Sequence, residues 1–264
     1  MDFEHLIYNV DNLVATLTLN RPETLNALTP SMRQSFEAAL ELAETDDSVR
    51  VIVITGAGKG FCSGGDVKAM NEARKSGKAS VLDDKIDPIR DRIVLALRDS
   101  TKPIIAAVNG AAAGAGMNIA LACDIRIASD TAKFGETFAK RGLHPDWGGT
   151  YFLPRIVGMA KACELIWSGK MIQAREALEL GIVSQLETPE ALMTATLEMA
   201  NSFAAGPPIA IRMAKRAMYR SMDSTLREAL EFETYAQNTC SATSDAKEGI
   251  AAFVEKREAV FTGH

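Results

Sequence analysis

The chain has 264 residues, of which 47% are hydrophobic and 24% charged, and its formal net charge at pH 7 is −5. This length fits one larger α/β domain with a substantial core, and the acidic balance gives no electrostatic reason to expect a nucleic acid partner. No apolar run reaches the roughly 18 residues that a membrane-spanning helix needs.

The cysteines and histidines do not form a metal-binding pattern. The four cysteines lie far apart without a CxxC pair, and the three histidines are scattered along the chain. Metal sites need such ligands at close, regular spacing, so we expect no metal. The first residues, MDFEHLIYN, are acidic and alternating, unlike a signal peptide, so we predict a cytoplasmic protein.

The N-terminal part predicts a strand followed by a helix. Residues 3–20 alternate between apolar and polar side chains, with Ala15, Leu17 and Leu19 on one side, as in a half-buried strand. The pair Thr29-Pro30 then predicts a helix start, because proline is favoured at the first helical position.

Two later segments each predict a buried strand that runs into small residues and opens a helix. The first is VRVIVITGAG (49–58), continued by FCSGGDVKAM (61–70), and the second is KPIIAAVNGAAAGAG (102–116). Residues 124–135 predict two further strands. This order indicates an α/β fold made of β-α repeats, with ligands at the carboxyl ends of the strands.

Beyond about residue 158 we expect helices without further strands. Gly181 marks a helix end, and AGPP at 205–208 marks another break. We therefore divide the chain into an α/β core over residues 1–187 and a helical region over 188–264 that docks on the core or on another subunit.

Five stretches together resemble the enoyl-CoA hydratase/isomerase (crotonase) family. They are LNRPETLNALT, GAGKGFCSGGDVKAM, AAVNGAAAGAGMNIALACDIRIAS, GLHPDWGGTYFLPRIVG and EGIAAFVEKREAVF, and the likeness extends from about residue 6 to 262. The resemblance implies a spiral of ββα repeats with a C-terminal helical trimerisation region, in a homotrimer or hexamer. It also implies an acyl-CoA thioester as substrate and no separate cofactor, since coenzyme A is part of the substrate.

The resemblance further implies two backbone amides that hold the thioester oxygen as it becomes an enolate. By family register these are the amides of Ser63 and Ala115, in loops whose small residues let a ligand approach the backbone. Lys256 resembles the tail lysine that meets CoA phosphates, whereas Glu23 stands where many relatives have lysine. The implied substrate contacts are Thr24, Leu25, Ser63, Gly64, Gly65, Asp66, Ala115 and Lys256.

The two glutamates of the family's hydratases are missing. Asn118 and Phe138 stand at the matching positions, and neither side chain can transfer a proton at neutral pH. Glu136 lies two residues from the second position, at a different depth, and is a weak substitute.

Asp146 is the candidate catalytic residue. It matches an aspartate that members without these glutamates carry, notably ring-1,2-epoxyphenylacetyl-CoA isomerase and several 3-enoyl-CoA isomerases. A double-bond shift needs one shuttle that takes a proton at C2 and returns it at C4, so one carboxylate is sufficient. We expect Leu143, Trp147 and Phe138 to desolvate Asp146, which suits a base that also acts as an acid.

The roles of individual residues near this acid stay open from the sequence. Asp146 could be a turn residue, Asn118 could bind substrate or water or only fill a polar gap, and His144 could be a partner of Asp146 or a surface residue. A dehalogenase would need a histidine between the two loops, and the chain has none between His5 and His144.

A dihydroxynaphthoyl-CoA synthase would have different residues where Trp147-Gly148-Gly149 stand. Thioester hydrolysis, an atypical hydratase and an acyl-CoA-binding subunit without chemistry are also compatible with the sequence. The sequence does not indicate which acyl group the substrate carries, although residues 71–92 are expected to form a wall of the acyl pocket.

Overall fold

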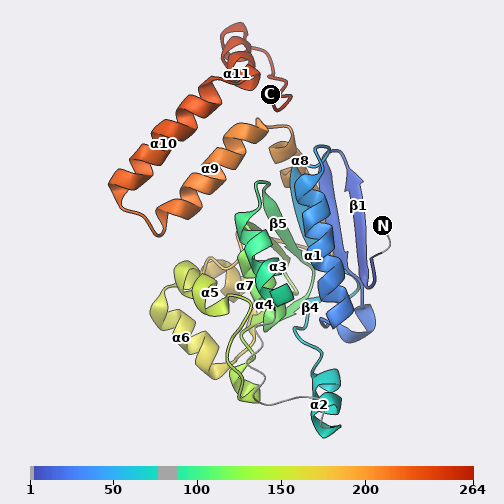
Figure 1. Ribbon diagram of the computed structural model, residues 1–264. Coiled ribbons are helices and arrows are strands. Elements are labelled where there is room, and N and C mark those ends of the chain that lie inside the picture. The colour runs from blue at the N-terminus through green and yellow to red at the C-terminus, as the bar shows by residue number, and fades with distance from the viewer. Residues whose placement is uncertain (1–2, 77–87) are drawn as a thin grey trace.

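The computed structural model describes residues 3–76 and 88–264, and it contains two sheets with helices around them (Figure 1). The six-stranded sheet has the order β1 (Leu6–Asp11), β2 (Val14–Leu19), β3 (Val51–Gly56), β5 (Ile104–Val108), β7 (Ile125–Ser129) and β10 (Gln185–Glu187). The four-stranded sheet has the order β4 (Gly60–Cys62), β6 (Ala111–Ala113), β8 (Lys133–Gly135) and β9 (Ile172–Gln173).

The strands follow one another as ββα repeats. Each of β3, β5 and β7 lies in the larger sheet and is followed by a short strand of the smaller sheet, and then by helix. The helices of this part are α1 (Pro30–Thr45), α2 (Val67–Lys75), α3 (Pro88–Asp99), α4 (Ala115–Ala122), α5 (Gly149–Val157), α6 (Met159–Ser168) and α7 (Ala174–Glu179). The expected spiral α/β fold is confirmed.

The core lies on both faces of the six-stranded sheet. All six residues of β3 are buried, and successive side chains point to opposite faces of the sheet. Ile52 and Ile54 join the large apolar cluster with α1 and α3, whereas Val51 and Val53 join a second cluster with α8 (Leu192–Ala204). A strand that is buried on both sides reads as a continuous apolar run, which is why the sequence pattern identified it.

Helix α1 begins where the sequence predicted it. The hydroxyl of Thr29 accepts a hydrogen bond from the Met32 amide at 3.1 Å, and Pro30 occupies the first helical position. Met32, Phe36, Ala39 and Leu40 form its buried face.

Two expectations about strands are corrected. The alternating run over residues 3–20 is a hairpin, because Asn12 and Leu13 both have positive φ and form a two-residue turn between β1 and β2. Strands also continue beyond residue 158, as β9 and β10. These have only two and three residues, too short for a period of two to be recognised.

The last three helices extend away from the sheets as an arm (Figure 1): α9 (Pro208–Ser221), α10 (Leu226–Ser241) and α11 (Ser244–Glu255). A buried ion pair between Lys215 Nζ and Asp124 Oδ2, at 2.8 Å, ties α9 to the core. Helix α8 also belongs to the predicted helical region, but it lies against the six-stranded sheet.

No helix within the described parts of the chain is both long and apolar enough to cross a membrane. In those same parts, no group of three or more metal-binding side chains comes together.

Candidate active site

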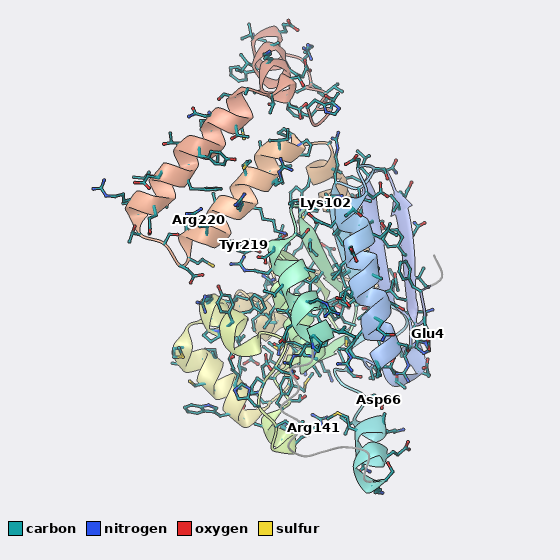
Figure 2. All side chains as sticks on the ribbon, in the orientation of Figure 1. Glu4, Asp66, Lys102, Arg141, Tyr219 and Arg220 are labelled. Carbon is teal, nitrogen blue, oxygen red and sulfur yellow. The ribbon has the colours of Figure 1, made fainter. Side chains whose placement is uncertain are left out.

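A cavity of about 580 Å³ lies where the loops after β4 and β6 meet the segment that leads into α5. Its wall includes Ser63, Gly64, Gly65 and Asp66 from the first loop, Gly114 and Ala115 from the second, and residues between Thr137 and Trp147 from the third. Figure 2 labels Asp66 and Arg141, two of the wall residues, near the end of the molecule where α2 lies.

The first two loops touch each other, and two glycines allow the contact. A Cβ on Gly64 would lie 2.8 Å from the carbonyl oxygen of Ala113 and 3.5 Å from the amide nitrogen of Ala115. A Cβ on Gly116 would lie only 2.0 Å from the carbonyl oxygen of Cys62. The small residues therefore bring the Ala115 amide, at the N-terminus of α4, directly beside the first loop.

The expected pair of oxyanion donors changes in one member. The Ser63 amide donates to the carbonyl oxygen of Leu25 at 2.9 Å, so its single N–H is already used. The amides of Gly65 and Ala115 line the cavity, and neither has a hydrogen-bond acceptor among the described residues. We therefore replace Ser63 by Gly65 as the partner of Ala115.

Asn26 holds the first loop in place. This fully buried side chain donates from Nδ2 toward the carbonyl oxygens of Ala57, Gly60 and Phe61, at 3.0, 2.8 and 3.2 Å. Its Oδ1 accepts from the Arg21 amide at 2.8 Å. The LNRPETLNALT stretch thus supports the loop that carries the candidate donor amide.

Asp146 also lies on the cavity wall, in the turn before α5. Its carbonyl oxygen accepts from the Gly149 amide at 3.2 Å, and Trp147 next to it is buried with a positive φ. The Asp146 side chain is 38% exposed, and its Oδ2 lies 3.5 Å from Nη1 of Arg90 on α3. Trp147, Phe138 and Leu143 share the cavity with Asp146, as expected, and Arg90 adds a cation beside the carboxylate.

The two residues at the hydratase positions differ in location. Phe138 lines the cavity, whereas Asn118 is fully buried behind it. Nδ2 of Asn118 donates to the carbonyl oxygen of Asp146 at 2.7 Å and lies 3.4 Å from Oε2 of Glu136. Asn118 therefore fills a polar role in the scaffold, and its side chain does not reach the cavity wall.

Glu136 is buried and does not line the cavity. Burial is the main cause that raises the pKa of its carboxyl to about 8. The Asn118 hydrogen bond lowers this pKa by less, and the nearby charge of Asp146 raises it further. Glu136 therefore carries a proton at neutral pH.

The other predicted substrate contacts are only partly brought together. Thr24 and Leu25 lie behind the first loop, where their carbonyl oxygens accept hydrogen bonds from Ser63. Lys256 ends α11, at the opposite end of the molecule from α2 in Figure 1. His144 is exposed on the cavity wall. Of the expected pocket wall over residues 71–92, residues 77–87 lie outside the described residues.

Sequence reasoning missed Arg90 and the bracing role of Asn26. Arg90 belongs to the charged stretch that we expect to form a wall of the acyl pocket, and nothing in that stretch signals a partner 56 positions away. The signal for Asn26 is its residue type, because asparagine tolerates the left-handed conformation of tight turns. Asn26 adopts that conformation here, with φ of 58°.

Comparison with known proteins shows which family the chain belongs to. The family model for enoyl-CoA hydratase/isomerase matches residues 9–264. The chain is 38% identical to the 1,2-epoxyphenylacetyl-CoA isomerase of Escherichia coli K12, over 98% of this chain and 99% of that protein. It is 37% identical to the short-chain-enoyl-CoA hydratase of Clostridium acetobutylicum, over 98% of this chain and 97% of that protein.

A solved structure supports the same assignment. The crystal structure of an enoyl-CoA hydratase subunit from Geobacillus kaustophilus HTA426 superposes with a TM-score of 0.92 at 36% identity, covering 100% of both chains. The relatives' names include both hydratases and isomerases. By its motifs, its fold and these matches, the chain belongs to the enoyl-CoA hydratase/isomerase family.

Proposed function

We propose that this enzyme is an enoyl-CoA isomerase that shifts a double bond through a thioester enolate, with Asp146 as its acid and base. One observation carries the proposal. Of the described residues that line the cavity, only Asp66 and Asp146 have carboxylates. Asp66 is held by the Ala69 amide at 3.1 Å and by Arg21 at 3.3 Å. We assign the proton transfer to Asp146, which also matches the aspartate of the isomerases that the sequence resembles.

The reaction needs two kinds of groups on opposite sides of the substrate. The amides of Gly65 and Ala115 would hold the thioester oxygen, and one such donor is typically worth about 3–4 kcal/mol of transition-state stabilisation. The Asp146 carboxylate would remove a C2 proton from a 3-enoyl thioester, and the electrons would move into the dienolate. The same carboxyl would then return the proton at C4, which gives the 2-enoyl product.

Hydration is the alternative, and the residues at its two usual positions argue against it. Adding water across a 2-enoyl thioester requires a group that activates water and a proton source. Asn118 is buried behind the cavity and Phe138 has no polar atom, so neither supplies these functions. We expect poor hydration of crotonyl-CoA.

The test is a panel of straight-chain 2-enoyl, 3-enoyl and ring-containing CoA thioesters, followed by ultraviolet spectroscopy. Asp146→Asn keeps the size of the side chain but removes the base, so isomerisation should fall roughly 10²–10⁴-fold while substrate still binds. His144→Ala, a change on the same wall, should cost much less. Near-full turnover of Asp146→Asn, or hydration as fast as any isomerisation, would rule out this function.

We also propose that the arm of α9–α11 forms subunit contacts in a homotrimer or hexamer. Its exposed apolar side chains support this: Phe253 is 86%, Ile250 is 69% and Tyr235 is 55% exposed. Phe232 of α10, in contrast, packs within the chain, beside Met213 of α9. A monomer at micromolar concentration in light scattering would contradict the proposed assembly.

The substrate class is proposed to be the CoA thioester itself, with Lys256 meeting CoA phosphates across a subunit contact. Its position far from its own chain's cavity is consistent with a role in a neighbour's site. Calorimetry should detect binding of an acyl-CoA and no binding of the free acid. Equal affinities would contradict this part of the proposal.

A further inference from the structure

Glu136 is a buried acid that the proposed reaction does not use. It follows β8 directly, its side chain is fully buried, and its Oε1 has no hydrogen-bond partner among the described residues. A buried carboxyl is costly unless it is paired or neutral, so its presence directly behind the active site requires an explanation.

Asn118 connects this acid to the turn that carries Asp146. Its Nδ2 lies between Oε2 of Glu136, at 3.4 Å, and the carbonyl oxygen of Asp146, at 2.7 Å. The amide packs so closely on Gly149 that a Cβ there would lie 2.4 Å from Nδ2. The Glu136 and Asn118 side chains therefore form one buried polar pair against the back of the Asp146 turn.

We propose that Glu136 is a positioning residue for Asp146, which fixes the Asp146 turn through its hydrogen bond with Asn118. This inference rests on the proposed role of Asp146 as the base. The two carboxyls interact electrostatically, because the charge of Asp146 adds to burial in raising the pKa of Glu136.

The two carboxyls have different surroundings. Arg90 from α3 lies 3.5 Å from the Asp146 carboxylate, and the Asp146 side chain is 38% exposed. From α4, Glu136 meets the neutral amide of Asn118, and the charge acting on it comes from Asp146. Burial, and to a lesser degree the charge of Asp146, therefore keeps the proton on Glu136.

Raising the pH through about 8, the raised pKa of Glu136, would place a second negative charge behind the same turn. The two charges repel each other, and the Asn118 amide cannot neutralise either. We expect this second ionisation to loosen the Asp146 turn and to lower the rate.

The first experiment is a pH–rate profile of kcat/KM from pH 6 to 9.5 for the wild type, Glu136→Gln and the surface control Glu190→Gln. Wild type and control should lose at least threefold above pH 8. Glu136→Gln keeps the shape and the hydrogen bond but cannot ionise, so it should retain activity at pH 7 within about threefold and show no such fall. If kcat/KM of Glu136→Gln fell above pH 8 as much as that of the wild type, the proposal would be overturned.

The second experiment follows carboxyl groups by ¹³C NMR in glutamate-labelled protein, with Glu136 assigned by its absence in Glu136→Gln. In the wild type the Glu136 signal should titrate near pH 8, and in Asp146→Asn it should titrate at lower pH because the like charge is gone. Titration below pH 5.5 in the wild type, or an unmoved signal in Asp146→Asn, would overturn the coupling. If Asp146→Asn retained turnover while the coupling was present, the proposed function would fail and the carboxyl pair would stand.

Discussion

Replacing Asn26 by alanine should destabilise the enzyme strongly, although this side chain touches no substrate group in our proposal. The amide of this fully buried side chain can make three hydrogen bonds at once, two from Nδ2 and one to Oδ1. At about 1 kcal/mol net for each bond, the loss is about 3 kcal/mol. Alanine in the left-handed conformation adds about 1 kcal/mol.

The resulting loss of about 4 kcal/mol in the free energy of unfolding should lower the melting temperature by roughly 8–16 °C for a chain of this size. Urea unfolding and calorimetry measure both quantities. Asn201→Ala, an exposed position on α8, is the matched control and should change little. A loss below about 1 kcal/mol for Asn26→Ala would refute the inference that this amide braces the first loop.

Three further predictions concern the loops, the buried acid and the arm. Gly116→Ala should cost about 1–3 kcal/mol of stability and at least tenfold in turnover, because its Cβ would meet the Cys62 carbonyl oxygen at 2.0 Å and push the two loops apart; unchanged kinetics would contradict the close approach. Glu136→Gln should gain stability relative to wild type as the pH rises from about 5 to 8. Because the pKa of Glu136 is raised, the free energy of unfolding of the wild type should fall by up to about 1.4 kcal/mol per pH unit over that window. Urea midpoints of wild type and Glu136→Gln that change equally with pH would contradict this prediction. Phe253→Ser should shift light scattering toward the monomer without lowering the subunit's own stability, since the ring is 86% exposed in one chain; an unchanged assembly would place the contact elsewhere.

The sequence predicts the fold best where the buried helices and strands are long. The apolar runs of β3 and β5, and the Thr29-Pro30 start of α1, gave strong local patterns. Of the two- and three-residue strands, β8 was predicted within residues 124–135. The strands β4, β6, β9 and β10 were missed, because pairing with distant strands defines them and no internal period does.

The candidate site was predictable as a set of loops but not atom by atom. Family register pointed to the first small-residue loop, yet the choice between the Ser63 and Gly65 amides depends on Leu25, a contact far away in the sequence. From the sequence, Glu136 is a weak substitute for a hydratase glutamate, because it lies two residues from that position. In the structure it is buried and hydrogen-bonded to Asn118, which the sequence does not indicate. Arg90 is brought to Asp146 by the tertiary packing of α3.

The most direct test of the central claim is hydrogen exchange at C2 of a saturated acyl-CoA in deuterated solvent, which requires a base and an enolate but no double bond. We predict that the wild type exchanges the C2 protons, that Asp146→Asn slows this exchange at least 100-fold, and that both bind the thioester equally well. A wild type that binds the thioester but leaves its C2 protons unexchanged, or an Asp146→Asn variant that exchanges them at the wild-type rate, would contradict the assignment of Asp146 as the catalytic base.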